Sequence, residues 1–246
     1  MKLSVVIPAY NEENSIEETV QDLHSTLTDE KIDHEILVVN DHSSDSTEAV
    51  LLELESKILN LRHINNPTPN GFGYAVRYGL NNFSGDCVAI VMADASDLPL
   101  DLVRFYRKMV EGNFDAVFGS RFMIGGKTVG YPLPKLIINR IANIFIQILF
   151  GLKYNDFTNA FKLYRRETIE GLQPFLAPHF NLTVELSLKT IVRHFSYTWV
   201  SNTWHNRKSG KSNLNIKEMG SRYLFIVLYC LIEKLLTHND YSKDQI

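Results

Sequence analysis

The chain has 246 residues, of which 45% are hydrophobic and 22% are charged, and its formal net charge is −3. A chain of this length buries a substantial core, and its composition is that of an ordinary globular protein, which excludes collagen-like, coiled-coil and wholly disordered chains. Because positive charge is not in excess, we expect no nucleic-acid partner.

Short apolar runs alternate with amphipathic segments through the first half of the chain. This alternation predicts an α/β fold with a mainly parallel sheet and helices on both faces. The expected strands are residues 3–7, 35–40, 61–65, 87–92 and 115–119. The expected helices are residues 15–27, 45–55, 73–82 and 101–111.

Two longer apolar runs, residues 136–152 and 223–232, lie in the second half. In the first run Asn139, Asn143 and Gln147 recur every four positions, which is typical of an amphipathic helix with a wide apolar face. Neither run reaches the roughly 20 apolar residues of a membrane-spanning helix. The helices are therefore expected either in the core or a dimer interface, or on a membrane surface.

The two cysteines, Cys87 and Cys230, lie in apolar runs, so we expect buried thiols and no disulfide.

The N-terminus indicates a cellular location. The sequence opens directly on a strand pattern, without a charged-then-apolar leader. We therefore expect the protein in the cytoplasm, or peripherally at the inner face of the cell membrane.

Ligands of a parallel sheet bind beyond the carboxyl ends of its strands, and polar side chains stand there in this sequence. Asp41 follows the second strand, where a carboxylate can accept hydrogen bonds from a ribose diol or a base edge. The first turn, PAYNEEN, contains no glycine, and no GxxxxGK[ST] loop exists. The sequence thus disfavours a nicotinamide dehydrogenase and a P-loop protein.

Asp94 and Asp97 follow the fourth strand in the segment MADASDLP. On one interpretation Asp97 caps the next helix and Asp94 is a solvated turn residue. On the other, both carboxylates hold Mg²⁺ or Mn²⁺, whose coordination shell a bound diphosphate would complete.

Basic side chains stand at two further places. Arg121 follows the fifth strand in GSRF, where it suits either a phosphate contact or a surface salt bridge. The segment WHNRKSGK contains Arg207, Lys208 and Lys211, which suit either a solvated face or a flexible anion-binding loop.

Several segments follow one another in a familiar order: VVIPAYNEENSI, VVNDHSSDST, NGFGYAVRYGL, GSRF, DFTNAFKLYRR and WHNRKSGKSNL. Together they resemble the family 2 glycosyltransferases of the GT-A fold, and especially the polyprenyl-phosphate (dolichol-phosphate) sugar transferases. The resemblance implies one domain over residues 1–246. Its parts would be a nucleotide-sugar-binding half (1–125), an acceptor and membrane-facing half (126–238) and a tail (239–246), which we expect to be frayed.

The resemblance also implies roles for individual residues. Asp94, Asp97 and Arg121 are expected to be catalytic. The nucleotide-sugar is expected to contact Pro8, Ala9, Tyr10, Glu12, Val39, Asp41, Ala93, Asp94 and Arg121. The acceptor phosphate is expected to contact Lys162, Arg207 and Lys211.

The metal motif departs from the family pattern. The family commonly carries Asp-x-Asp, and here Met92 stands where the first aspartate would be. Asp94 matches the second aspartate, whereas Asp97 is an addition that can replace the missing carboxylate. Ser96 is a further expected metal ligand.

The activity implied is inverting transfer of a sugar from a UDP- or GDP-linked donor to a polyprenyl phosphate, by in-line displacement. A divalent ion on Asp94, together with Arg121, would stabilise the leaving diphosphate. A phosphate acceptor is already anionic and needs no strong general base.

Two alternatives stay open. A saccharide hydroxyl acceptor would need a base, for which Asp97, Asp156 and Glu185 are candidates. A protein that binds nucleotide-sugar or scaffolds a membrane without turnover is the other. A wide apolar helix face also suits a homo-oligomer.

Overall fold

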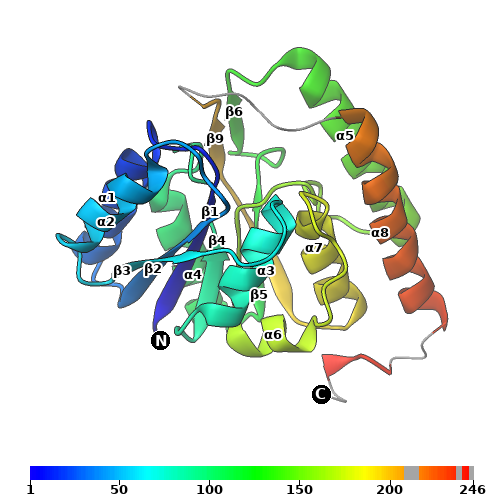
Figure 1. Cartoon of the computed structure of the whole chain (residues 1–246). Coiled ribbons are helices and arrows are strands. Elements are labelled where there is room, and N and C mark those ends of the chain that lie inside the picture. Colours follow the sequence, from blue (N-terminus) through cyan, green and yellow to red (C-terminus); the bar gives the residue numbers. More distant parts are fainter. Residues whose placement is uncertain (208–215, 237–239, 244–246) are drawn as a thin grey trace.

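A seven-stranded sheet forms the centre of the protein, which we describe from a computed structural model of residues 1–207, 216–236 and 240–243 (Figure 1). In spatial order the strands are β3 (Leu61–Asn65), β2 (His34–Asn40), β1 (Leu3–Ala9), β4 (Cys87–Ile90), β7 (Lys162–Arg165), β5 (Ala116–Ser120) and β8 (Tyr197–Ser201). Strand β7 is antiparallel to both its neighbours, and the other neighbours pair in parallel. The predicted mainly parallel α/β sheet is confirmed.

Helices cover both faces of the sheet because its strands are apolar on both sides. Val5 and Ile7 pack in a core with α1 (Ile16–Asp29), α2 (Thr47–Glu55) and α4 (Pro99–Gly112). Val6, which points the other way, packs in a second core with α3 (Phe72–Asn82) and α7 (Leu182–Val192). The five predicted strands and four predicted helices are all present, with shifted ends.

The second half of the chain contains elements that the sequence did not reveal. They are β7, β8, the short helix α6 (Arg166–Gly171), helix α7 and a separate two-stranded sheet of β6 (Lys127–Val129) and β9 (Thr203–His205). β7 enters between β4 and β5, so a segment of the second half completes the sheet of the first. Cys87 and Cys230 are buried thiols, as predicted.

The two apolar runs form α5 (Leu133–Phe150) and α8 (Ile216–Leu236), which lie together along one edge of the molecule (Figure 1). Lys234 of α8 donates a hydrogen bond to the carbonyl of Phe150, 3.0 Å away. Ile141 and Ile148 of α5 are 63% and 78% exposed, so α5 is not a core helix of the single chain. By length and apolar composition alone, α5 could also cross a membrane. The number of apolar residues in the sequence run 136–152 did not predict this.

The end of the chain differs from the frayed tail that we expected. Lys243 donates through its backbone N–H to the carbonyl of Arg193 at 2.8 Å. Its Nζ donates to the two carboxylate oxygens of Asp115 at 2.9 and 2.7 Å. The described part of the tail, residues 240–243, is therefore attached to the body of the protein.

Candidate active site

One cavity of about 820 Å³ opens at the carboxyl edge of the sheet and continues to α5 and α8. Its polar lining comes from the segments that follow β1, β2, β4 and β5, together with Arg207, which follows β9. The main polar side chains are Glu12, Asp41, Asp94, Asp97, Arg121 and Arg207. Much of its apolar lining comes from α5 and α8: Ile138, Ala142, Phe145, Ile146, Leu224 and Val227. The cavity is thus charged at one end and apolar at the other.

Asp94 and Asp97 are both buried in the turn between β4 and α4, at 8% and 7% exposure. Asp94 Oδ1 accepts a hydrogen bond from the backbone N–H of Ser96 at 3.2 Å. Neither oxygen of Asp97, nor the Ser96 hydroxyl, has a hydrogen-bond partner among the described residues. Burial, and next the negative charge of Asp94, raise the pKa of Asp97 to about 7.

The capping interpretation of Asp97 is wrong. Helix α4 begins at Pro99, its N-cap residue is Leu98, and no side chain caps it in the described part of the chain. The Asp97 carboxylate is therefore buried without capping the helix, and buried polar groups without hydrogen-bond partners are rare in native proteins.

The residues of this turn fit a divalent metal ion. Two carboxylates and a hydroxyl present oxygen atoms, which Mg²⁺ and Mn²⁺ prefer, and three of these atoms lack partners. Within the described ranges no group of three His, Cys, Asp or Glu side chains forms a metal site. An ion held here would accordingly take the rest of its ligands from water and from a substrate phosphate.

Arg121 is held by a buried ion pair. Its Nε and Nη2 donate to the two carboxylate oxygens of Asp156 at 2.8 and 2.6 Å, and its backbone N–H donates to the same carboxylate at 2.9 Å. Burial alone would lower the pKa of Arg121, but Asp156 raises it above its usual value. The guanidinium is therefore a fixed positive charge in the cavity wall rather than a surface salt bridge.

Helix α5 is tied to the segment that carries Asp156. Asn139 and Asn143 donate to the Thr158 hydroxyl at 2.8 and 3.1 Å. The Asn143 side-chain oxygen accepts from the backbone N–H of Phe157 at 2.6 Å. The polar stripe of α5 thus anchors the helix beside the charged end of the cavity.

Asp41 holds a neighbouring loop in place. Its carboxylate accepts from the Asn66 amide at 2.7 Å, the Asn70 amide at 3.2 Å and the Gly71 N–H at 2.8 Å. Gly73 lies in the first turn of α3, and a Cβ added there would lie 2.4 Å from the Pro178 backbone. Asp41 and Gly73 together fix the cavity wall at the start of α3.

Residues 4–172 match the family model described as glycosyl transferase family 2. The chain belongs to this family.

Two curated relatives are similar along most of the chain. The polyprenol monophosphomannose synthase of Mycolicibacterium smegmatis is 29% identical over 223 residues, covering 87% of this chain and 82% of that protein. The dolichol-phosphate mannosyltransferase of Pyrococcus furiosus is 29% identical over 222 residues, covering 88% of this chain but only 60% of that protein. The match therefore spans about three fifths of the length of the second relative.

A solved structure shares the fold. Glucosyl-3-phosphoglycerate synthase from Mycobacterium tuberculosis, in complex with Mn²⁺, UDP and phosphoglyceric acid, superposes with a TM-score of 0.71. The two sequences are 22% identical, and the match covers 95% of this chain and 78% of that one. The predicted GT-A architecture is confirmed by this likeness and by the family match.

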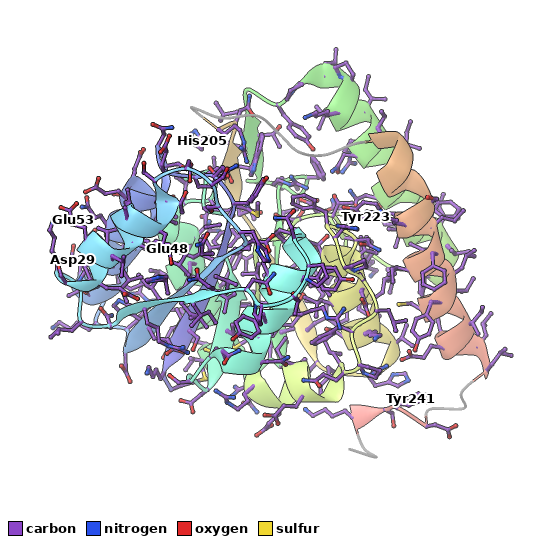
Figure 2. All side chains as sticks on the ribbon, in the orientation of Figure 1. Asp29, Glu48, Glu53, His205, Tyr223 and Tyr241 are labelled. Atoms are coloured by element: carbon purple, nitrogen blue, oxygen red, sulfur yellow. The ribbon has the colours of Figure 1, made fainter. Side chains whose placement is uncertain are left out.

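The cavity of this family 2 glycosyltransferase contains most of the predicted site residues. Those that line it are Pro8, Ala9, Tyr10, Glu12, Asp41, Asp94, Ser96, Asp97, Arg121 and Arg207. Lys211 lies outside the described residues. Tyr131, Lys135 and Tyr223 also line the cavity, the last from α8 (Figure 2), and no sequence motif pointed to them. Asn70, Gly71 and Thr158 do so too, and they belong to segments that carried the family resemblance.

One predicted contact is wrong. Lys162 is 1% exposed, and its Nζ donates to the carbonyls of Phe157 and Thr183 and to the Ser187 hydroxyl. Burial lowers the pKa of this ammonium group well below its usual value. Val39 and Ala93 are buried in the two cores and are not among the residues that line the cavity, so their contacts with the nucleotide-sugar stay predictions.

Two of the candidate general bases are also committed elsewhere. Asp156 is paired with Arg121, as described above. Glu185 is fully buried, accepts from the backbone N–H groups of Leu176 and Ala177, and pairs with Lys189 at 2.7 Å. Asp97 remains as the candidate base of a hydroxyl acceptor.

Replacing Asp97 tests whether its carboxylate serves binding rather than folding. In EDTA, Asp97→Asn should raise the free energy of unfolding by about 1 kcal/mol or more, because it removes a buried carboxylate without partners. The measurement is urea unfolding followed by circular dichroism.

Asp101→Asn is the matched control for this variant. Asp101 is equally buried, but it pairs with Arg104 and accepts from the Thr203 N–H, both at 2.8 Å, so its replacement should destabilise the protein. A loss of stability in Asp97→Asn as large as in Asp101→Asn would show that Asp97 is a structural residue.

Proposed function

We propose that this glycosyltransferase moves a sugar from a nucleotide-diphospho-sugar to a polyprenyl phosphate at a membrane surface, with inversion at the anomeric carbon. The observation that carries the proposal is the single cavity that joins a charged end to an apolar end. A nucleotide diphosphate suits the charged end, and a polyprenyl chain suits the apolar end. The names of the two curated relatives support the same acceptor class.

The donor occupies the charged end in this proposal. Tyr10, Glu12 and Asp41 stand where a nucleoside would lie, and Asp94 with Asp97 would hold Mg²⁺ or Mn²⁺ on its diphosphate. When bound, the ion offsets the negative charge that develops on the leaving diphosphate. Arg121, fixed by Asp156, adds a positive charge that needs no rearrangement during the reaction. The donor is a UDP- or GDP-linked sugar.

The acceptor phosphate needs cations other than Lys162. Lys135 on α5 lines the cavity one turn before Ile138, and Arg222 on α8 lines it two residues before Leu224. Together with Arg207, they place three cationic side chains in the cavity lining. The phosphate is itself the nucleophile, so the commitment of Asp156 and Glu185 to other contacts does not prevent the reaction.

The outer surfaces of α5 and α8 support a peripheral position at the inner face of the membrane. Ile141, Ile148, Phe225 and Leu235 are between 62% and 78% exposed, and they belong to neighbouring helices. Burying such a surface in the interfacial layer of a bilayer is favourable, and it would bring the apolar end of the cavity to the lipid.

A transfer assay tests the proposed function directly. Wild-type protein should transfer sugar from at least one UDP- or GDP-sugar to polyprenyl phosphate in vesicles, and EDTA should stop the reaction. Asp94→Asn should reduce the rate by about 100-fold or more, as loss of charge stabilisation in a transition state does. Glu53→Gln, on the outer side of α2 (Figure 2), is the control with the same charge change.

Two results would contradict this proposal. Transfer to saccharide hydroxyls, with none to polyprenyl phosphate, would replace the acceptor class. A wild-type rate in Asp94→Asn would remove the metal site from the mechanism.

Membrane binding is tested separately by a double variant of α5. Ile141→Ser with Ile148→Ser should lower binding to anionic vesicles at least tenfold, since each buried isoleucine contributes about 1.5–3 kcal/mol. Leu59→Ser is the control, because Leu59 is fully exposed and lies outside α5 and α8. Sedimentation with vesicles measures the binding. Unchanged binding together with loss of an oligomer would assign this surface to a homo-oligomer.

A further inference from the structure

Arg207 forms an ion pair with Asp94, the first candidate ligand of the metal ion. Its Nη2 donates to Asp94 Oδ2 at 2.8 Å and lies 3.6 Å from Glu12 Oε1. The Arg207 side chain is 22% exposed and the Asp94 side chain 8%, so the pair is largely shielded from water. The turn that carries Asp94 and Asp97 (the acidic turn) is therefore in contact with a cationic side chain 113 residues further along the chain.

The two carboxylates of the turn differ in their partners. Asp94 has one oxygen on the Ser96 N–H and the other on Arg207. Asp97 has no hydrogen-bond partner among the described residues. A metal ion that bound the Asp94 oxygen facing the guanidinium would place two cations at that oxygen, and they would repel each other.

The other basic side chains near the turn are arranged differently. Arg121 is committed to Asp156, and Lys162, which does not line the cavity, is buried with three oxygen partners. Lys135 lines the cavity, but it forms no ion pair within the described part of the chain. Arg207 is thus placed to act on the metal site itself.

We propose that Arg207 is a built-in counter-cation that competes with the divalent ion for Asp94. In the metal-free protein the guanidinium neutralises the acidic turn. The guanidinium would leave Asp94 when a divalent ion and the donor diphosphate are both bound, because phosphate oxygens would supply the ligands that the described residues alone do not. The displaced guanidinium then turns to the phosphates that have entered the cavity. This inference rests on the proposed function for the identity of the phosphates.

Competition between Arg207 and the metal ion for Asp94 predicts a change in the affinity of the protein for Mn²⁺ alone. If Arg207 must leave Asp94 before the ion binds, the free energy of the ion pair is subtracted from that of metal binding. Removal of the guanidinium should then tighten the binding of Mn²⁺ alone. In the presence of a nucleoside diphosphate the gain should shrink, because the phosphates lose a positive partner.

The test compares Mn²⁺ binding to wild-type protein, Arg207→Met, Arg207→Lys and Lys135→Met. Methionine keeps the aliphatic stem without the charge, and lysine keeps the charge. Lys135→Met removes a cavity cation that is not paired with Asp94. Titration calorimetry or electron paramagnetic resonance of free Mn²⁺ gives the dissociation constants without sugar or lipid.

We expect Arg207→Met to bind Mn²⁺ about tenfold more tightly than wild type, which corresponds to about 1.4 kcal/mol. Arg207→Lys should stay closer to wild type, and Lys135→Met should change the constant by less than about twofold. The inference is overturned if Arg207→Met changes Mn²⁺ affinity no more than Lys135→Met, if it weakens binding, or if Mn²⁺ binds to neither form.

The outcome is separable from that of the proposed function. Sugar transfer by wild type, with equal Mn²⁺ affinity in wild type and Arg207→Met, would overturn the competition and leave the function standing. Tighter Mn²⁺ binding in Arg207→Met without transfer to polyprenyl phosphate would support the competition and overturn the acceptor assignment.

Discussion

Two carboxylates that share one buried turn set the electrostatic requirement for the whole site. Asp94 and Asp97 are less than a tenth exposed, and like charges so placed are unfavourable unless a cation joins them. The chain provides one such cation in Arg207, which pairs with Asp94 and lies 3.6 Å from Glu12. A divalent ion would satisfy both side chains, and the unpartnered oxygens of Asp97 are the structural sign of that second arrangement.

The fold builds the cavity from two different kinds of surface. Parallel strands bring their carboxyl ends to one edge of the sheet, and this gathers the charged side chains of distant segments. Helices α5 and α8 then extend the cavity with apolar side chains. Asn139 and Asn143 join the two surfaces, because they bind the Thr158 hydroxyl beside the segment that holds Arg121. A ligand with an anionic head and an apolar tail matches this construction.

The sequence predicted what depends on local pattern and strand position. Continuous apolar runs indicated the buried strands, and the side chains after them, such as Asp41 and Asp94, do line one cavity. The sequence could not show which charges form ion pairs, because the partners lie far apart along the chain. Arg121 pairs with Asp156, 35 residues away, and Arg207 pairs with Asp94, 113 residues away. The sequence also could not show that the Lys162 side chain is held in the interior, because its partners Phe157, Thr183 and Ser187 are set by the fold.

The most direct measurement of the central claim is anomalous diffraction from crystals grown with Mn²⁺ and a nucleoside diphosphate. We predict a manganese peak within coordinating distance of carboxylate oxygens of both Asp94 and Asp97, with diphosphate oxygens in the same coordination shell. A peak bound to other residues, or a bound nucleotide with no manganese at this turn, would contradict the account.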